Sequence, residues 1–356
     1  MDHMDTPTVE AETIEGILSR YEPYLQICRS AITIRLKEYP HTAVLTRYFD
    51  RGKMFRALLT FAATSATGGN LQNMIKVAAS IELLHGGSLI HDDIIDEATS
   101  RRGLPALHQK VGIGPAIVLG DYLILCSMTV LLETEALFEP SKVRVALQVL
   151  SDDAQACCRG ELRELLPSPE SDLEKNYLAI IRGKTASQFA AAVALPVILG
   201  GGGPDTIRAM RRYGLYLGIA FQIHDDMLDL IGDTNILGKP VGASLVKGRP
   251  MLPLIYLERY GSEAACQVGR QLLREIEYGG HAELVTLLRE EGIFDRVMAT
   301  RDEYVSRALQ ALDQLGCSTD LEVLRTLATC AATHQFPHTL FGAAAPQDAS
   351  VIGVTS

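Results

Sequence analysis

One apolar helical run in this sequence carries three aspartates and is followed by two arginines: Ser88-Leu-Ile-His-Asp-Asp-Ile-Ile-Asp-Glu-Ala-Thr-Ser-Arg-Arg-Gly103. Residues four apart on a helix are neighbours on one face, with Cβ atoms roughly 5–6 Å apart. Asp92 and Asp96 therefore point the same way, and Asp93 lies beside them. Carboxylates this close repel one another unless cations lie between them. The stretch therefore predicts a cation-binding site.

A second acid cluster lies far along the chain, in Phe221-Gln-Ile-His-Asp-Asp-Met-Leu-Asp229. Both clusters have the form His-Asp-Asp-x-x-Asp, and both lie near the end of a predicted helix that leads to a cationic loop. One cluster alone is more often a solvated surface, but two of the same form are hard to explain that way. Magnesium suits such sites, because it binds one or two carboxylates together with substrate phosphates at about 2.0–2.1 Å. Two facing sites therefore indicate a diphosphate held between them.

Cationic side chains lie at helix ends or beside Gly and Pro, where they could converge on phosphate oxygens. Arginine favours bidentate phosphate contacts, whereas lysine acts as a point charge. Any one of these residues is more often an ordinary surface charge, so the interpretation depends on the set: Lys53, Arg56, Arg101, Arg102, Lys184, Lys239 and Arg249.

The spacing of apolar residues predicts an all-α protein, because they recur at intervals of three and four and strand-like alternation is scarce. We expect a single all-α domain over residues 1–336 and a disordered tail over 337–356, which is small and polar. Helices are expected over about 71–96, 140–166 and 204–231, with three more between about 253 and 332.

Composition narrows the function and the compartment. The net charge of −10 argues against a nucleic-acid partner, which needs a basic face. Seven cysteines without a C-x-x-C pair favour a reducing, cytoplasmic location, and the N-terminus lacks the features of a secretory signal. The apolar run over 116–132 is interrupted by Asp121 and is shorter than the roughly 20 residues of a membrane span. We expect it to be a buried core helix, and the protein not to be transmembrane.

The motifs taken together resemble those of the trans-isoprenyl diphosphate synthases, which include the polyprenyl and geranylgeranyl diphosphate synthases. They occur in that family's order and spacing from about Gly52 to Pro253. The matching segments are Asp92-Asp-Ile-Ile-Asp96 with Arg101-Arg-Gly103, Gly120-Asp-Tyr-Leu123, Lys184-Thr185, Phe221-Gln-Ile-x-Asp-Asp-x-x-Asp229 and Gly238-Lys-Pro240.

The resemblance implies an isoprenoid synthase-type helical bundle around a central cavity, assembled as a homodimer. It also implies magnesium-dependent, head-to-tail condensation of isopentenyl diphosphate with an allylic diphosphate. By position, Asp92, Asp96 and Asp225 would ligate three magnesium ions, and Asp93, Asp226 and Asp229 would orient bound waters. The allylic diphosphate would be held by Arg101, Lys184, Lys239 and Arg249, and isopentenyl diphosphate by Lys53, Arg56, His85 and Arg102. Lys184, Thr185 and Gln222 would be the catalytic residues, the last two near the reacting carbons.

Product length is expected to depend on the residues just before Asp92. Gly87 and Ser88 lie about 6–7.5 Å down the helix axis at 1.5 Å per residue. Both are small, whereas family members with short products block this level with aromatic side chains. This favours an all-trans product of C20 or longer. The alternative is that Gly87 and Ser88 serve only close helix packing.

Two other functions fit parts of this pattern. A class I terpene cyclase on the same scaffold would keep both acid clusters but would not need the isopentenyl diphosphate site. A non-catalytic subunit of a heteromeric prenyl synthase would tolerate the loss of acids from either cluster. The cations of the second site are present and both clusters are complete, which favours chain elongation.

Overall fold

Long helices make up almost all of the chain that the structure describes. The computed structural model describes residues 13–167, 170–231, 242–276, 279–316 and 318–333. In these ranges the only sheet is a two-stranded hairpin, β1 (Ser100–Arg101) and β2 (Leu104–Pro105). The all-α prediction is confirmed. The predicted tail over 337–356 and Lys239 lie outside the described residues.

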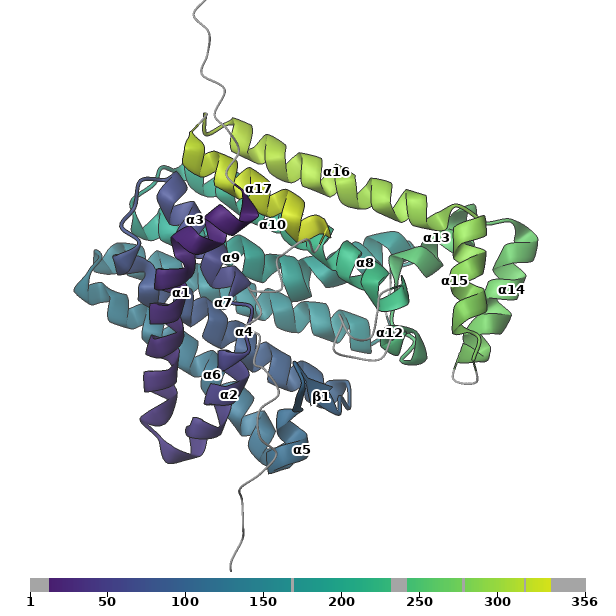
Figure 1. Cartoon of the computed structure of the whole chain (residues 1–356), viewed down its shortest axis with the longest axis horizontal. Coiled ribbons are helices and arrows are strands. Elements are labelled where there is room, and N and C mark those ends of the chain that lie inside the picture. The colour runs from purple at the N-terminus through teal and green to yellow at the C-terminus, as the bar shows by residue number, and fades with distance from the viewer. Residues whose placement is uncertain (1–12, 168–169, 232–241, 277–278, 317, 334–356) are drawn as a thin grey trace, which may run out of the picture.

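The first half of the chain forms a layer of helices around α4, the helix that ends in the first acid cluster (Figure 1). α1 starts where the Thr13 side chain accepts a hydrogen bond from the backbone N–H of Gly16. The α-helices are α1 (Ile14–Lys37), α2 (Thr46–Asp50), α3 (Phe55–Ala66), α4 (Ile75–Ile95), α5 (Leu107–Val111), α6 (Ile113–Leu132) and α7 (Pro140–Leu165). Short 3-10 turns occupy Pro40–Leu45, Gln72–Met74 and Glu133–Ala136.

The second half contains the helix of the second acid cluster and a projecting helical pair. Asp172 caps α8 by accepting hydrogen bonds from the backbone N–H groups of Glu174 and Lys175. The helices are α8 (Leu173–Ile181), a π-helical turn (Arg182–Ala186, here called the π turn), α9 (Ser187–Leu199), α10 (Pro204–Ile231), α12 (Ala243–Val246), α13 (Leu252–Tyr260), α14 (Glu263–Arg274), α15 (His281–Glu290), α16 (Ile293–Asp313) and α17 (Thr319–Thr333).

The expectation of three helices after residue 253 is wrong, because five helices, α13 to α17, occupy this region. Glycine-containing turns divide this region into more helices than the spacing of its apolar residues predicts. Gly292, for example, has φ +65°, a left-handed conformation that glycine adopts at little cost, and it separates α15 from α16. α14 and α15 extend away from the main body beyond the end of α16 (Figure 1).

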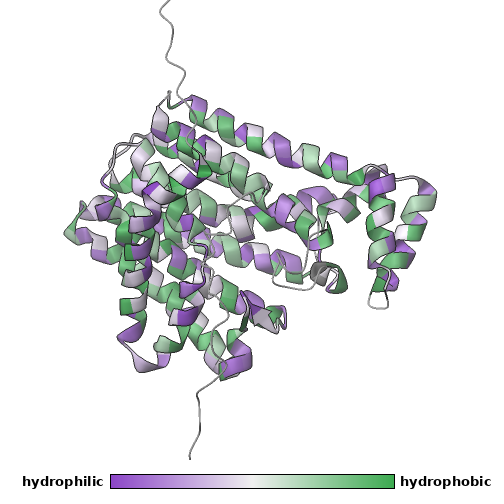
Figure 2. Cartoon of the chain, in the orientation of Figure 1, coloured by the Kyte–Doolittle hydropathy of each residue, from purple (hydrophilic) through white to green (hydrophobic). Residues whose placement is uncertain are grey.

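Two apolar clusters hold the molecule together. The larger joins α1, α3, α4, α6 and α9, and the smaller joins α8, α10, α13 and α16. α9 is buried at every residue, as expected for a helix that is apolar on all sides. By contrast, α16 mixes polar and apolar residues along its length (Figure 2), as expected for a helix with one exposed face. The site-bearing helices α4, α7 and α10 therefore pack around a rigid apolar centre.

α6 departs from its prediction as a buried core helix. One side packs on α4, but Ile117, Val118 and Leu125 of the other side are exposed, at 42%, 65% and 64%. The segment Ile113–Ala136 is long and apolar enough to cross a membrane by length and composition, and 44% of its most apolar window is buried. Such a helix is weak evidence for a membrane span. The apolar run is visible in the sequence, but the sequence does not show that one face of it stays exposed among the residues that the structure describes.

Candidate active site

The first acid cluster lies at the C-terminal end of α4 and is surrounded by cations. Asp93 is buried and accepts a 2.7 Å hydrogen bond from Nε of Arg101. Asp96 accepts one from Arg249, and the Nζ atom of Lys247 lies 3.3 Å from its Oδ1. Burial raises the pKa of Asp92 to about 6, although nearby Lys184 opposes the shift. The three carboxylates are therefore held close together by positive charge from three other segments.

The β1–β2 hairpin directs the two arginines that follow the cluster to different places. Arg102 and Gly103 form its turn with φ of +52° and +72°, as a type I′ turn requires. Arg101 reaches back to Asp93, whereas Nη1 of Arg102 donates to the backbone oxygen of Tyr48 at 3.3 Å. The two adjacent arginines therefore have different protein partners, and their roles toward two substrates stay a prediction.

A second group of cations surrounds the buried carboxylate of Glu82. This carboxylate accepts a 2.9 Å hydrogen bond from the backbone N–H of Ala57, at the start of α3, and Arg56 and Arg102 are its charged neighbours. Burial lowers the pKa of Arg56 to about 10, with Glu82 opposing the shift. Burial and the nearby arginines hold the pKa of His85 well below its ordinary value, so the imidazole is neutral at pH 7.

Lys53, the remaining member of this second cation group, faces the second acid cluster. Lys53 is exposed, and its charged neighbours are Asp225 of α10 and Arg102 of the hairpin. His85, Arg101 and Arg102 line a narrow pocket together with Glu82 and Gly52. The predicted set Lys53, Arg56, His85 and Arg102 is thus brought to one side of α4.

The π turn carries Lys184 and Thr185 between the two acid clusters. Nζ of Lys184 donates to Oε2 of Glu164 at 2.5 Å and also pairs with Glu161, and Asp92 lies near it. The Thr185 hydroxyl donates to the side-chain oxygen of Gln222 at 2.7 Å. Lys184 therefore faces the first acid cluster, and the adjacent Thr185 faces α10, the helix that carries the second acid cluster.

The second acid cluster continues this hydrogen-bond chain along α10. The Gln222 amide donates to Oδ1 of Asp226 at 2.8 Å, and the hydroxyl of Tyr177 donates to Oδ2 of the same residue at 2.5 Å. Asp229 is buried one turn further on. Asp225 is the residue of this cluster that faces Lys53. Both oxygens of Asp226 are thus oriented by side chains from two other turns of helix.

The turn itself depends on a close glycine contact. A Cβ at Gly183 would lie 2.6 Å from the backbone oxygen of Ala156, and one at Gly160 would lie 2.7 Å from the backbone nitrogen of Lys184. α7 and the π turn therefore touch through their backbones, which brings Glu161 and Glu164 within reach of Lys184.

Sequence reasoning missed the acids of α7 and the buried Glu82. Glu161 and Glu164 are three residues apart, the spacing of neighbours on one helix face, but this spacing is common on solvated helices. Glu82 lies in an otherwise apolar segment of α4. This pattern could have indicated a buried acid, which needs a charged or hydrogen-bonding partner. Tyr177 carries no signal of its own.

The two residues expected to control product length lie on different faces of α4. A Cβ at Gly87 would lie 2.8 Å from the backbone oxygen of Gly120 and 2.8 Å from Cγ1 of Ile124, so this position faces α6. Ser88 faces α9 instead, where its Oγ accepts a 3.3 Å hydrogen bond from Gln188. For Gly87 the structure supports the packing alternative, and Ser88 remains as a candidate.

The side chains of the two acid clusters offer carboxylate oxygens, the ligands that magnesium prefers. Among the described residues, no group of three His, Cys, Asp or Glu side chains is arranged to hold a metal by itself. This is compatible with magnesium, which takes one or two protein carboxylates and completes its shell with substrate phosphates and water. The carboxylates of each cluster are oxygen donors with lysine and arginine side chains beside them, and this set fits such an ion.

Comparison with known proteins places the chain in one family. The family model described as Polyprenyl synthetase matches residues 40–283. A short chain isoprenyl diphosphate synthase of Methanothermobacter thermautotrophicus is 37% identical over 275 residues, which is 77% of this chain and 81% of the relative. An octaprenyl diphosphate synthase of Haemophilus influenzae is 32% identical over 325 residues, 89% of this chain and 95% of the relative. The chain belongs to the polyprenyl synthetase family.

Solved structures of this family share the fold. A geranylgeranyl pyrophosphate synthetase from Pyrococcus horikoshii has a TM-score of 0.81 at 30% identity, covering 90% of this chain and 99% of its own. A polyprenyl synthase from Caulobacter crescentus, crystallised with calcium and isoprenyl diphosphate, also has a TM-score of 0.81, at 27% identity, covering 91% and 98%. As a member of this polyprenyl synthetase family, the chain is a trans-prenyltransferase, and its relatives support prenyl chain elongation.

Glu82 provides a test of the buried charge group in this synthetase. We expect Glu82→Ala to lower the free energy of unfolding by about 1–3 kcal/mol, because it leaves the Ala57 N–H without an acceptor and half-buried Arg56 without its counter-ion. Glu82→Gln should lose less, since it keeps an oxygen acceptor for that N–H. Urea unfolding followed by circular dichroism measures both.

The matched control is Glu283→Ala, which removes an exposed glutamate of α15. Its effect should stay within about 0.5 kcal/mol. If Glu82→Ala were no more destabilising than this control, the counter-ion role of Glu82 would be wrong.

Proposed function

We propose that this protein catalyses magnesium-dependent, head-to-tail condensation of isopentenyl diphosphate with an allylic diphosphate. The observation that carries the proposal is the π turn, where Lys184 faces the first acid cluster and Thr185 is linked to the second through Gln222. A diphosphate between the clusters would meet carboxylate-bound cations from both sides and the Lys184 ammonium from a third. Arg249 would add a further positive charge beside the diphosphate. It contacts Asp96 and lies 3.7 Å from Glu164.

Ionisation of the allylic C–O bond requires stabilisation of negative charge as it develops on the leaving diphosphate. Magnesium ions held by Asp92, Asp96 and Asp225 would supply part of that stabilisation as Lewis acids. Lys184 and Arg249 would bind the same group with fixed positive charge, which needs little reorganisation during the reaction. Asp93, Asp226 and Asp229 would act indirectly by orienting bound water.

The second substrate would bind on the other side of α4. Arg56, Arg102 and Lys53 would hold the diphosphate of isopentenyl diphosphate, with neutral His85 as a hydrogen-bond partner. The double bond of this substrate attacks the allylic cation, and the proton that is then lost can go to the departing diphosphate. Thr185 and Gln222 would lie beside the reacting carbons, and the apolar surroundings would exclude water.

We also propose that the chain works as a homodimer in the cytoplasm. The exposed apolar face of α6 supports pairing, because Ile117, Val118 and Leu125 would be covered by the same face of a second copy. The six described cysteines are all free thiols, which is compatible with a reducing compartment. On this proposal the apolar helix serves assembly and does not span a membrane.

Product analysis tests the reaction. With magnesium and dimethylallyl, geranyl, farnesyl or geranylgeranyl diphosphate, we expect elongated products by mass spectrometry only when isopentenyl diphosphate is present. Asp92→Asn should lower kcat/KM by at least about a hundredfold, because it removes metal-binding charge, whereas Asp121→Asn, at an exposed acid of α6, should not. A hydrocarbon or alcohol formed without isopentenyl diphosphate would instead indicate a cyclase, and no turnover would indicate a non-catalytic subunit.

Ser88 tests the length of the product, which we propose to be C20 or longer. Ser88→Phe should shift the product mass to shorter chains, because the ring would fill the space between α4 and α9 below Asp92. Ser88→Ala removes the hydroxyl without adding bulk and should leave the distribution unchanged. An unaltered distribution in Ser88→Phe, with activity retained, would rule out this position as the limit on chain length.

The dimer is tested at α6. Val118→Glu with Leu125→Glu places charges in the centre of the proposed interface, and sedimentation should then show a monomer where the unmodified chain is a dimer. Arg144→Gln, at an exposed residue of α7, serves as a control. A dimer that persists in the double variant would place the interface elsewhere.

A further inference from the structure

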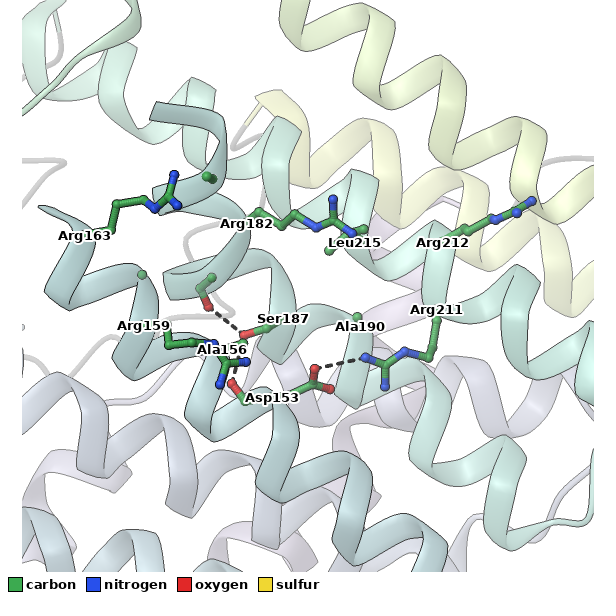
Figure 3. A pocket seen from close by; sticks show the side chains of 13 residues that line it. Asp153, Ala156, Arg159, Arg163, Arg182, Ser187, Ala190, Arg211, Arg212 and Leu215 are labelled. Atoms are coloured by element: carbon green, nitrogen blue, oxygen red, sulfur yellow. Dashed lines mark hydrogen bonds and ion pairs between the residues drawn. The ribbon is translucent and has the colours of Figure 1, made fainter. Parts of the chain in front are cut away.

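A pocket of about 450 Å³ lies between α7, the π turn and α10 (Figure 3). The proposed reaction does not use it. It is lined by five arginines from three elements: Arg159 and Arg163 of α7, Arg182 of the π turn, and Arg211 and Arg212 of α10.

Most of this positive charge is not neutralised by the protein. Asp153 is the one acid that lines the pocket, and its Oδ1 lies 3.0 Å from Nη2 of Arg211. The other four arginines are exposed and form no ion pair with any residue that the structure describes. A single exposed arginine is usually just solvated, but this group surrounds one hollow in a chain of net charge −10. The pocket is therefore a local site of attraction for anions.

Asp153 supplies a second, independent indication of a ligand. Its side chain is buried, at 4% exposure, and its Oδ2 has no hydrogen-bond partner among the described residues. A buried carboxylate oxygen normally accepts a hydrogen bond. Oδ2 is itself enclosed by protein atoms, so a hydroxyl or amino group on a bound molecule would satisfy it once the side chain turns toward the pocket.

The rest of the lining is small and apolar. Ala156, Ala179, Ala190 and Leu215 leave room beside the arginines for a nonpolar moiety. The volume falls within the usual range of small-molecule pockets. A concave pocket of this size suits a compact ligand better than a membrane surface or a nucleic-acid backbone, each of which would need an extended basic face.

We propose that this pocket binds a small organic phosphate that carries a hydroxyl or amino donor, as nucleoside phosphates do. The guanidinium groups of Arg159, Arg163 and Arg182, on the side of the pocket formed by α7 and the π turn (Figure 3), pair with the phosphate oxygens, for which planar arginine forks are well matched. The donor group of the ligand bonds to Asp153, and its nonpolar part lies on the alanines.

The pocket is also coupled to the reaction by its position. Gly183 and Ser187 line it, and they flank Lys184 and Thr185 in the chain. The Ser187 hydroxyl donates to the backbone oxygen of Gly183 at 2.7 Å, across the π turn. A molecule in the pocket therefore touches the reverse side of the turn that positions both residues, and its binding alters turnover.

Binding is tested by titrating the protein with ADP in a calorimeter. A chelator removes divalent metal, so that the acid clusters cannot bind the diphosphate of ADP through metal ions. We expect saturable binding of ADP, weaker binding of inorganic diphosphate, which lacks both a hydroxyl donor and a nonpolar part, and loss of affinity as salt increases. Arg159→Gln with Arg163→Gln should weaken ADP binding by at least about tenfold, since charged hydrogen bonds are lost.

The matched control is Arg144→Gln with Arg274→Gln, which removes the same charge at two exposed arginines outside the pocket. It should bind ADP as the unmodified chain does. The pocket assignment would be overturned by absent ADP binding, by equal binding in both double variants, or by binding of anionic phosphatidylglycerol vesicles without binding of ADP. A change in turnover with ADP that is the same in both double variants, or no change at all, would overturn the coupling.

Discussion

The site depends on bringing many carboxylates and many cations into one half-buried space. Asp92, Asp96, Glu161 and Glu164 would repel one another, but Lys184 and Arg249 lie among them. A buried charge without a partner costs several kcal/mol, so each of these groups constrains the position of the others. α4, α7 and the π turn each supply one part of this arrangement. The apolar core brings the helices together, and the charges fix their register.

The π turn is the element that allows both acid clusters to share one centre. An α-helix places successive side chains about 100° apart, so neighbouring residues point in different directions. Here Lys184 is directed to the acids of α4 and α7, and Thr185 to Gln222 of α10. Single π-helical turns inside helices occur frequently at functional sites. The backbone contact through Gly160 and Gly183 explains why the turn lies where it does, because no larger residue could approach so closely.

The sequence contained the fold class, both acid clusters and most of the cations, because these appear as local patterns. Three features could not be predicted in this way. The pairing of Lys184 with Glu161 and Glu164 depends on how α7 meets the π turn, which local spacing does not encode. The direction of Gly87 depends on the crossing of α4 and α6. The exposure of Val118 depends on which face of α6 finds a partner, and apolar composition alone does not distinguish a core from an interface.

The ion pairs within the site also bear on how substrate is bound. Lys184 and Arg249 contact carboxylates of the protein, yet they are the groups that would bind the diphosphate. Binding of metal and diphosphate would therefore exchange one set of partners for another: carboxylates would turn to metal, and the lysine and arginine to phosphate. Because these charges are already held in place by folding, little ordering is left to the binding step. Glu164, which contacts both cations, is then the residue whose partners change most, although no metal-binding motif marks it in the sequence.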